Sequence, residues 1–137
     1  MLIVSENNDF TTDKVIEWLF LMGIKEIVRI NEDDKVSIKE VDIQSNNIIL
    51  IFQKQEINLS EIAFFWFRRG NLNHFVYEQL DFESEKIKVQ MIKFLNYEWL
   101  MCRNYIFYCL QKKQSLGNFF RSATNKLVNL SIAKKCG

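Results

Sequence analysis

The sequence predicts a single α/β domain, in which helices flank a mainly parallel sheet and antiparallel hairpins extend that sheet. A strand, a helix and a second strand follow one another with short links in residues 2–30. Such a unit implies two parallel strands joined by a right-handed crossover. The apolar run at residues 63–67 predicts a further buried strand of the same sheet. A chain of 137 residues is long enough to bury the core of one such domain.

The first crossover unit has clear start and stop signals. Short apolar runs predict strands over residues 2–4 and 26–30. Between them, an apolar stripe at helical spacing predicts a helix over residues 12–22. Thr11 is a favourable N-cap for this helix, and Gly23 is placed to end it.

The middle third of the chain has a different pattern. Residues 35–59 alternate between apolar and polar side chains and are interrupted by polar turns, which predicts antiparallel hairpins. The alternation slips between Ile38 and Val41, as it does at a β-bulge. We expect these hairpins to extend the edge of the parallel sheet. The alternative is a mixed α+β domain in which they form a sheet of their own.

A long helix is predicted over residues 81–112, and its apolar residues cover more than half of its circumference. Such a helix must be covered on two sides. We expect Trp99, Phe107 and Leu110 to form a contact with a second copy of the chain, which would give a homodimer. The competing interpretation is that further domains of a longer protein cover this face.

Composition excludes several classes of function. The 18 basic and 17 acidic residues nearly balance, so we expect no nucleic-acid partner. No apolar segment is long enough to span a membrane, and no signal peptide begins the chain, so we expect a cytoplasmic protein. The three cysteines and His74 have no metal-ligand spacing, and the four glycines form no phosphate-binding loop.

Two adjacent arginines follow the apolar run at 63–67, and Gly70 follows them. Ligands of open α/β sheets bind beyond the carboxyl ends of the strands, and arginine suits doubly hydrogen-bonded binding of carboxylate or phosphate. The local pattern alone favours the simpler interpretation, a core strand followed by two solvated charges. A role for Arg68 and Arg69 in binding an anion is the alternative.

Four segments that occur in order resemble one family. They are residues 2–12, the Val28-Arg29-Ile30-Asn31 segment, the Phe65-Trp66-Phe67-Arg68-Arg69-Gly70 turn, and the final Asn125-Lys126-Leu127 with Ala133 and Gly137. Together they resemble the N-terminal, Rossmann-like pre-ATP-grasp domain of ATP-grasp peptide maturases. The likeness is to the graspetide enzymes of the grasp-with-spasm type, which are related to the ribosomal-protein glutamate ligases.

The resemblance implies a domain boundary, and it implies that other domains of the full-length enzyme bind the nucleotide. Residues 1–123 would form the pre-ATP-grasp domain, and 124–137 would be a helix leading into a missing ATP-grasp central domain. ATP and Mg²⁺ would be bound by the full-length enzyme. The chain alone would bind neither, would contribute no catalytic residue and would be inactive. The chain would be either a fragment or a natural short protein.

The same resemblance implies a function and a site. The full-length enzyme would crosslink side chains of a ribosomally made precursor peptide, by activating a carboxylate as an acyl phosphate and transferring it to a hydroxyl or an amine. This domain would shape the substrate side of the cleft, with these residues facing the peptide: Arg68, Arg69, Ser5, Asn8, Asp9 and Asn31. The alternative is a non-catalytic module that binds a peptide or a protein through an aromatic helix face.

Overall fold

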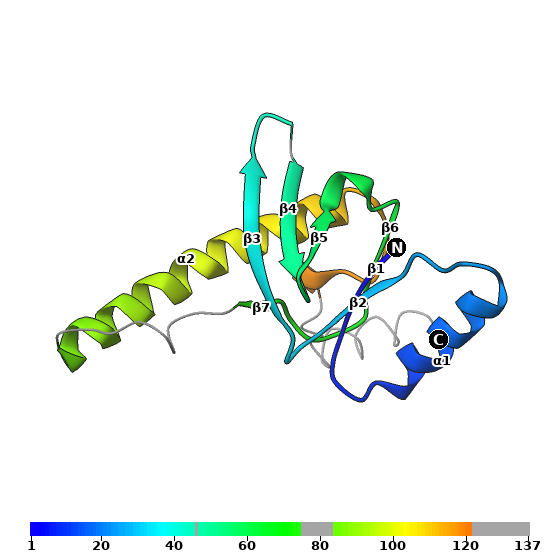
Figure 1. The fold of residues 1–137 in the computed structure, drawn as a ribbon, viewed down its shortest axis with the longest axis horizontal. Helices are drawn as coiled ribbons and strands as arrows, with labels where there is room; N and C mark the ends of the chain where they lie inside the picture. The colour runs from blue at the N-terminus through cyan, green and yellow to red at the C-terminus, as the bar shows by residue number, and fades with distance from the viewer. Residues whose placement is uncertain (46, 75–83, 122–137) are drawn as a thin grey trace, which may run out of the picture.

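The computed structural model describes residues 1–45, 47–74 and 84–121, which form two sheets and two long helices (Figure 1). The parallel sheet has the strand order β2 (Val28–Asn31), β1 (Leu2–Ser5), β6 (Phe64–Phe67) and β8 (Gln114–Leu116). The α/β fold class is therefore confirmed. The predicted helix over 124–137 and the boundary at residue 123 lie outside the described residues.

The hairpins form a second, mixed sheet and do not extend the edge of the parallel one. Its strand order is β5 (Gln55–Asn58), β4 (Asn47–Phe52), β3 (Lys35–Asp42) and β7 (Asn73–His74). The β3–β4 and β4–β5 pairs are antiparallel, whereas β7 pairs in parallel with β3. The separate sheet is the arrangement of the α+β alternative. The register of β3 shifts between Ile38 and Glu40, which confirms the predicted irregularity.

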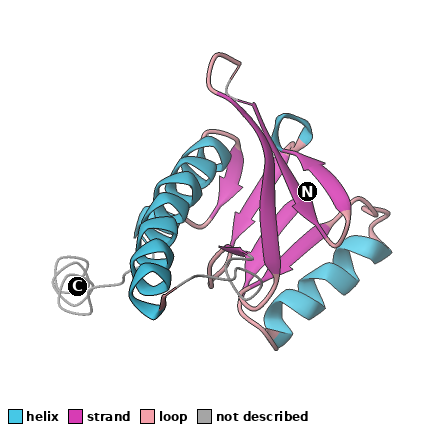
Figure 2. Ribbon diagram, turned by 60° about the vertical axis from the view of Figure 1, so that its left-hand side comes forward, coloured by secondary structure: helices cyan, strands magenta, loops and turns pink. Residues whose placement is uncertain are grey.

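Both faces of the parallel sheet are covered. Leu2 and Val4 of β1 and Phe65 and Phe67 of β6 point to one face, where they join the main core with the mixed sheet and the end of α2 (Glu85–Gln111). The opposite face carries buried Ile3 and lies beside α1 (Phe10–Leu21). In Figure 2 the two helices lie on opposite sides of the sheets.

The N-terminus of α1 corrects the predicted cap. The N-cap residue is Asp9, whose Oδ1 accepts hydrogen bonds from the backbone nitrogens of Thr11 at 3.2 Å and Thr12 at 3.4 Å. The helix therefore begins at Phe10, ahead of the predicted cap at Thr11. Gly23, with a φ of +87°, follows the C-cap as predicted.

Helix α2 also corrects the predicted contact surface. Phe107 and Leu110 are fully buried in the domain core, so neither side chain can meet a second copy of the chain. Trp99 is partly buried against the same core, and its Nε1 donates a hydrogen bond to the Leu72 carbonyl at 3.0 Å. The prediction that these residues form an interface was wrong for Phe107 and Leu110.

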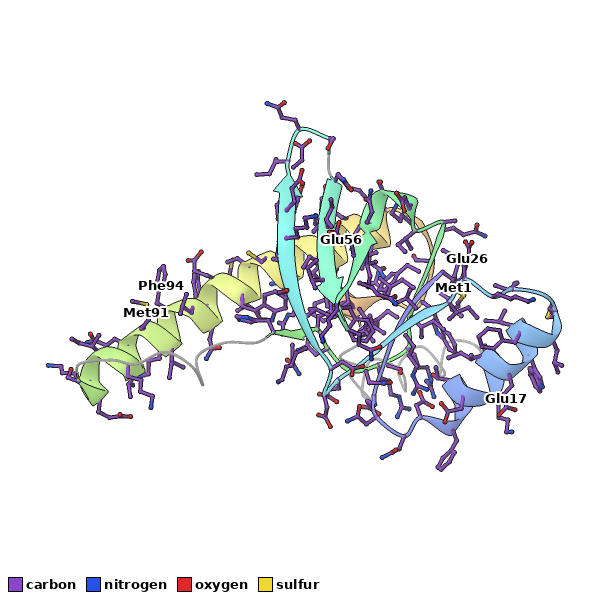
Figure 3. All side chains as sticks on the ribbon, in the orientation of Figure 1. Met1, Glu17, Glu26, Glu56, Met91 and Phe94 are labelled. Carbon is purple, nitrogen blue, oxygen red and sulfur yellow. The ribbon has the colours of Figure 1, made fainter. Side chains whose placement is uncertain are left out.

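Most of the exposed apolar side chains of α2 lie in its first half, and Met101 and Tyr108 are exposed in its second half. The first half extends beyond the sheets, and Met91 and Phe94 project from it (Figures 1 and 3). The Ser84 side chain caps the helix by accepting a hydrogen bond from the Ile87 nitrogen at 3.3 Å. Within the described residues, no helix is long and apolar enough to cross a membrane.

Candidate functional site

The connections of the parallel sheet place a topological switch point between β1 and β6. From β1 the chain crosses through α1 to β2 on one side, and from β6 it crosses through α2 to β8 on the other side. The loops after β1 and β6 therefore leave neighbouring parallel strands at the same edge and diverge. In open α/β sheets, ligands bind in the crevice that such a divergence leaves.

Backbone contacts hold these two loops together. The Val4 carbonyl at the end of β1 accepts hydrogen bonds from the nitrogens of Arg68 at 2.9 Å and Arg69 at 3.4 Å. Gly70 has a φ of +78°, and a Cβ added to it would lie 2.8 Å from the Ser5 carbonyl oxygen. Only glycine fits this close approach without strain. The Arg-Arg-Gly turn, on which the predicted site was based, therefore requires a glycine at position 70.

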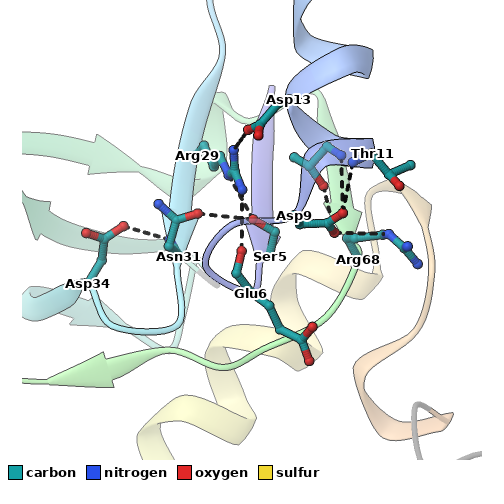
Figure 4. Close-up of polar contacts among 10 residues, drawn as sticks. Ser5, Glu6, Asp9, Thr11, Asp13, Arg29, Asn31, Asp34 and Arg68 are labelled. Atoms are coloured by element: carbon teal, nitrogen blue, oxygen red, sulfur yellow. Dashed lines mark hydrogen bonds and ion pairs between the residues drawn. The ribbon is translucent and has the colours of Figure 1, made fainter.

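Arg68 is bound to the N-terminus of α1. Its Nε lies 3.2 Å from Oδ2 of Asp9, as an ion pair without hydrogen-bond geometry (Figure 4). Burial alone would raise the pKa of Asp9. The hydrogen bonds from Thr12, the Arg68 charge and the hydrogen bond from Thr11 outweigh that effect, so the pKa lies below its ordinary value of 3.8. Asp9 therefore stays charged at neutral pH and fixes Arg68 in place.

A second cluster lies on the face of the sheet that α1 covers. Arg29 donates through Nε to Oγ of buried Ser5 at 2.8 Å, and Ser5 donates to Oδ1 of Asn31 at 3.2 Å. Arg29 also forms an ion pair with Asp13 of α1 and donates to the Glu6 carbonyl at 3.3 Å (Figure 4). These contacts hold the Arg29 guanidinium rigidly at the strand ends.

Arg29 was not among the predicted site residues. It lies two positions before Asn31 on β2, so the two side chains point to the same face of the sheet. That spacing, together with the resemblance of the Val28–Asn31 segment, was the signal that could have identified it. A charged residue inside a short strand at a sheet edge is otherwise read as a solvated side chain.

An open polar cleft of about 340 Å³ lies at these strand ends. Two of its lining residues, Asn8 and Asn31, were predicted, and three were not: Asn7, Asp13 and Arg29. Ser5, Asp9, Arg68 and Arg69 do not line this cleft, and Ser5 and Asp9 instead position Arg29 and Arg68. The structure therefore brings the predicted residues of the β1 and β6 loops together, and it divides them into lining and supporting groups.

The two adjacent arginines differ in their freedom to bind a ligand. The Arg68 side chain is 30% exposed and paired with Asp9, whereas the Arg69 side chain is 57% exposed and lies 3.6 Å from a carboxylate oxygen of Glu6. An exposed ion pair at such a distance is weak and easily exchanged. Arg69 is therefore the arginine of this pair that a ligand carboxylate can reach. Arg68 has a supporting position.

Comparison with solved structures reveals close similarity of fold. The macrocyclase MdnC from Microcystis aeruginosa MRC, crystallised with its precursor peptide MdnA, matches 99% of this chain with a TM-score of 0.66 and 21% identity. The macrocyclase MdnB from the same organism matches 99% with a TM-score of 0.63 and 20% identity. This chain spans 44% of the length of each macrocyclase.

A third structure connects the fold to ATP-grasp enzymes. It is a RiPP-associated ATP-grasp ligase from Chryseobacterium gregarium, in complex with ADP and with a leader and a core peptide. It matches 99% of this chain with a TM-score of 0.57 and 26% identity, and this chain spans 40% of its length. No protein-family model and no curated protein matches the sequence. The chain therefore has the fold of a domain of ATP-grasp peptide maturases, which confirms the resemblance carried by its sequence motifs.

Proposed function

We propose that this chain is the N-terminal domain of an ATP-dependent ligase that crosslinks side chains of a ribosomally made precursor peptide, and that its strand-end cleft forms the substrate side of the active site. The observation that carries the proposal is the switch point between β1 and β6. There the fold brings Arg68 and Arg69 to the same edge of the sheet as a cleft lined by Arg29, Asp13 and three asparagines. Two of the solved structures with this fold contain bound peptides.

The cleft suits a peptide with acidic side chains. Asparagine side chains both donate and accept hydrogen bonds, which suits an extended backbone, and arginine suits a carboxylate. Arg69 would exchange the solvated Glu6 carboxylate for a carboxylate of the peptide. In the proposed reaction that carboxylate is activated as an acyl phosphate and captured by a hydroxyl or an amine, and a nearby guanidinium would help to neutralise the developing charge.

ATP and Mg²⁺ would be bound by the rest of the enzyme. Within the described residues, no group of three or more His, Cys, Asp or Glu side chains could hold a metal ion. The cleft is lined by Arg29, Asp13 and three asparagines, and Arg68 and Arg69 lie on the neighbouring β6 loop; these side chains suit a peptide better than a nucleotide–metal complex. We therefore propose that this domain binds and orients the substrate, and that catalysis needs the remainder of a longer protein.

The alternative function is a non-catalytic interaction module. Exposed apolar side chains on both helices favour it, among them Phe10, Trp18 and Leu21 on α1 and Phe94 and Tyr97 on α2. Contiguous exposed apolar surface often marks a site of protein contact. The reading frame downstream of residue 137 distinguishes the two functions. A continuation with the carboxylates of an ATP-grasp domain supports the ligase, and a stop codon favours the module.

The arginines give a direct test of the proposed function. In the complete gene product, incubated with ATP and with the short peptides encoded beside its gene, we expect ATP-dependent loss of water from a peptide. Arg69→Ala should lower the turnover number about tenfold, because the carboxylate loses its partner in the transition state. Folding should be unchanged, since the side chain is exposed. Mass spectrometry of the peptide measures the turnover.

Lys39→Ala is the matched control, because Lys39 is also an exposed cation in an ion pair, with Glu56 on the mixed sheet away from the strand ends. The Lys39→Ala variant should retain full turnover.

Arg68→Ala should lower turnover as well, and it should also destabilise the domain, because Asp9 loses its ion-pair partner. Equal turnover of Arg69→Ala and Lys39→Ala would contradict the proposed role of the cleft, and no peptide modification by the complete protein would contradict the ligase.

A further inference from the structure

Charge is distributed very unevenly along this chain. All 17 acidic residues lie at or before Glu98, and seven basic residues follow it. The overall balance of +1 therefore conceals a C-terminal third that contains cations and no carboxylate side chain. Arg103 is the first of these seven cations, and it lies on α2.

Arg103 has no anionic partner among the described residues. None of the ion pairs within them includes it, and its Nε is buried without a hydrogen-bond partner. The Arg103 guanidinium lies over the ring of Phe119, whose centroid is 5.5 Å from the guanidinium carbon. Burial lowers the pKa of Arg103 below its ordinary value, because no carboxylate compensates for the lost hydration.

A guanidinium held in this way is unusual unless it binds something. A partly buried polar group that lacks a partner costs stability, and each such group in a native protein needs an explanation. An arginine stacked on an aromatic ring keeps the N–H groups of its edge free for a planar anion. Arg68 differs from Arg103 in this respect, because an oxygen of the Asp9 carboxylate lies 3.2 Å from the Arg68 Nε.

The position of Arg103 coincides with the functional edge of the parallel sheet. Helix α2 ends at Gln111 and β8 begins at Gln114, so the helix runs back toward the N-terminal ends of the strands. Arg103 lies eight residues before the end of the helix, about 12 Å along its axis, and a four-residue strand is about 13 Å long. Arg103 therefore lies level with the strand ends.

Aromatic contacts connect Arg103 to the β6 loop. Phe119, on which Arg103 stacks, lies 5.4 Å from the Phe67 ring between centroids, and Phe67 immediately precedes Arg68. Phe119 also stacks on Phe107 of α2 at 3.8 Å, which fixes the ring. Arg103 is thus presented on the face of the sheet opposite α1, on the far side of β6 from the Arg29 cluster.

We infer that Arg103 is a second carboxylate-binding residue of this domain, which holds an acidic side chain of the peptide on the α2 side of the strand ends. This inference rests on the proposed function and deepens it, because it names how the peptide would be selected. The strand-end cleft would bind one part of the peptide, and Arg103 would bind an acidic side chain farther along it. The peptide would then need carboxylates at a fixed separation.

The test compares two synthetic peptides, one rich in glutamate and one with glutamine at each of the same positions. Their affinities for the full 137-residue chain are measured by calorimetry. We expect the wild-type chain to prefer the glutamate peptide about tenfold or more. Arg103→Met should remove most of that preference by weakening the glutamate peptide alone, while the glutamine peptide binds as before. Thermal unfolding of each variant checks the fold.

Lys112→Met is the matched control, because Lys112 lies on the same helix and also stacks on an aromatic ring, that of Tyr108 at 4.1 Å. The Lys112→Met variant loses one positive charge at the other end of the sheet, and we expect it to retain the preference for the glutamate peptide. If Arg103→Met fails to fold, Arg103→Lys is measured, and it too should lose preference because an ammonium cannot form the paired hydrogen bonds. An undiminished preference in the folded variant overturns the inference and leaves the proposed function intact. Failure of the wild-type chain to bind either peptide overturns both.

Discussion

Gly117→Ala is expected to destabilise this domain by on the order of 4 kcal/mol or more, enough to prevent stable folding of many small proteins. Gly117 directly follows β8 and has a φ of +77°, in the left-handed region. An added Cβ would lie 1.9 Å from the Phe67 carbonyl oxygen, a distance that no side-chain movement can relieve. The backbone would have to separate, which would disrupt the pairing of β6 with β8 and move the arginine turn.

Gly23→Ala separates the steric effect from the conformational one. Gly23 has a φ of +87°, but nothing lies within 4 Å of the added Cβ. This variant should therefore lose only the cost of placing alanine in the left-handed region, about 1 kcal/mol. Urea unfolding of the two variants and the wild-type chain measures the difference. Equal losses for the two glycines would contradict the close approach of β8 to β6.

Phe107→Ala is expected to lower the free energy of unfolding by about 3–5 kcal/mol, because it leaves a large cavity in the core. The ring of Phe107 is fully buried and lies among the rings of Phe65, Phe67 and Phe119, at centroid distances of 6.2, 5.6 and 3.8 Å. No neighbouring side chain can fill that space without moving the others.

Phe94→Ala on the same helix provides the comparison. The Phe94 side chain is 57% exposed, so its removal should change the free energy of unfolding by no more than about 0.5 kcal/mol. Denaturant unfolding together with light scattering checks both variants. If Phe107→Ala leaves stability unchanged and alters the oligomeric state, the residue belongs to an interface and its assignment to the core is wrong.

The elements with strong local signals were predicted from the sequence. The apolar runs of β1 and β6 and the periodicity of α1 and α2 gave their positions within a few residues. Strand β8 was not predicted, because Gln114, Ser115 and Leu116 are all exposed and carry no strand pattern. The strand exists because α2 returns the chain to the edge of β6, and that arrangement is a property of the tertiary fold.

The error on α2 has a physical cause. Periodicity shows which side of a helix is apolar, but it does not show how much of its length a sheet will cover. A helix of 27 residues is about 40 Å long, and the four-residue strands of the parallel sheet span only about 13 Å. The buried residues of α2 therefore all lie in its last turns, and most apolar residues of its first half remain exposed.

The site could be predicted in outline. Because neighbouring parallel strands end at one edge, the residues that follow β1, β2 and β6 had to lie close together. The sequence could not show which of the two arginines a ligand can reach, since that depends on Asp9 capping α1 and pairing with Arg68. It also could not show the role of Arg29, which depends on contacts with Ser5 and Asp13 from two other elements.

Hydrogen exchange tests the central claim that the strand ends of the parallel sheet bind the peptide. The exchange of backbone amides is measured on the 137-residue chain with and without the glutamate-rich peptide. We predict slower exchange in the three strand-end segments, residues 5–9, 29–31 and 68–70. Slower exchange confined to the exposed faces of α1 and of the first half of α2, with no change in those segments, would contradict the claim and assign binding to the helices.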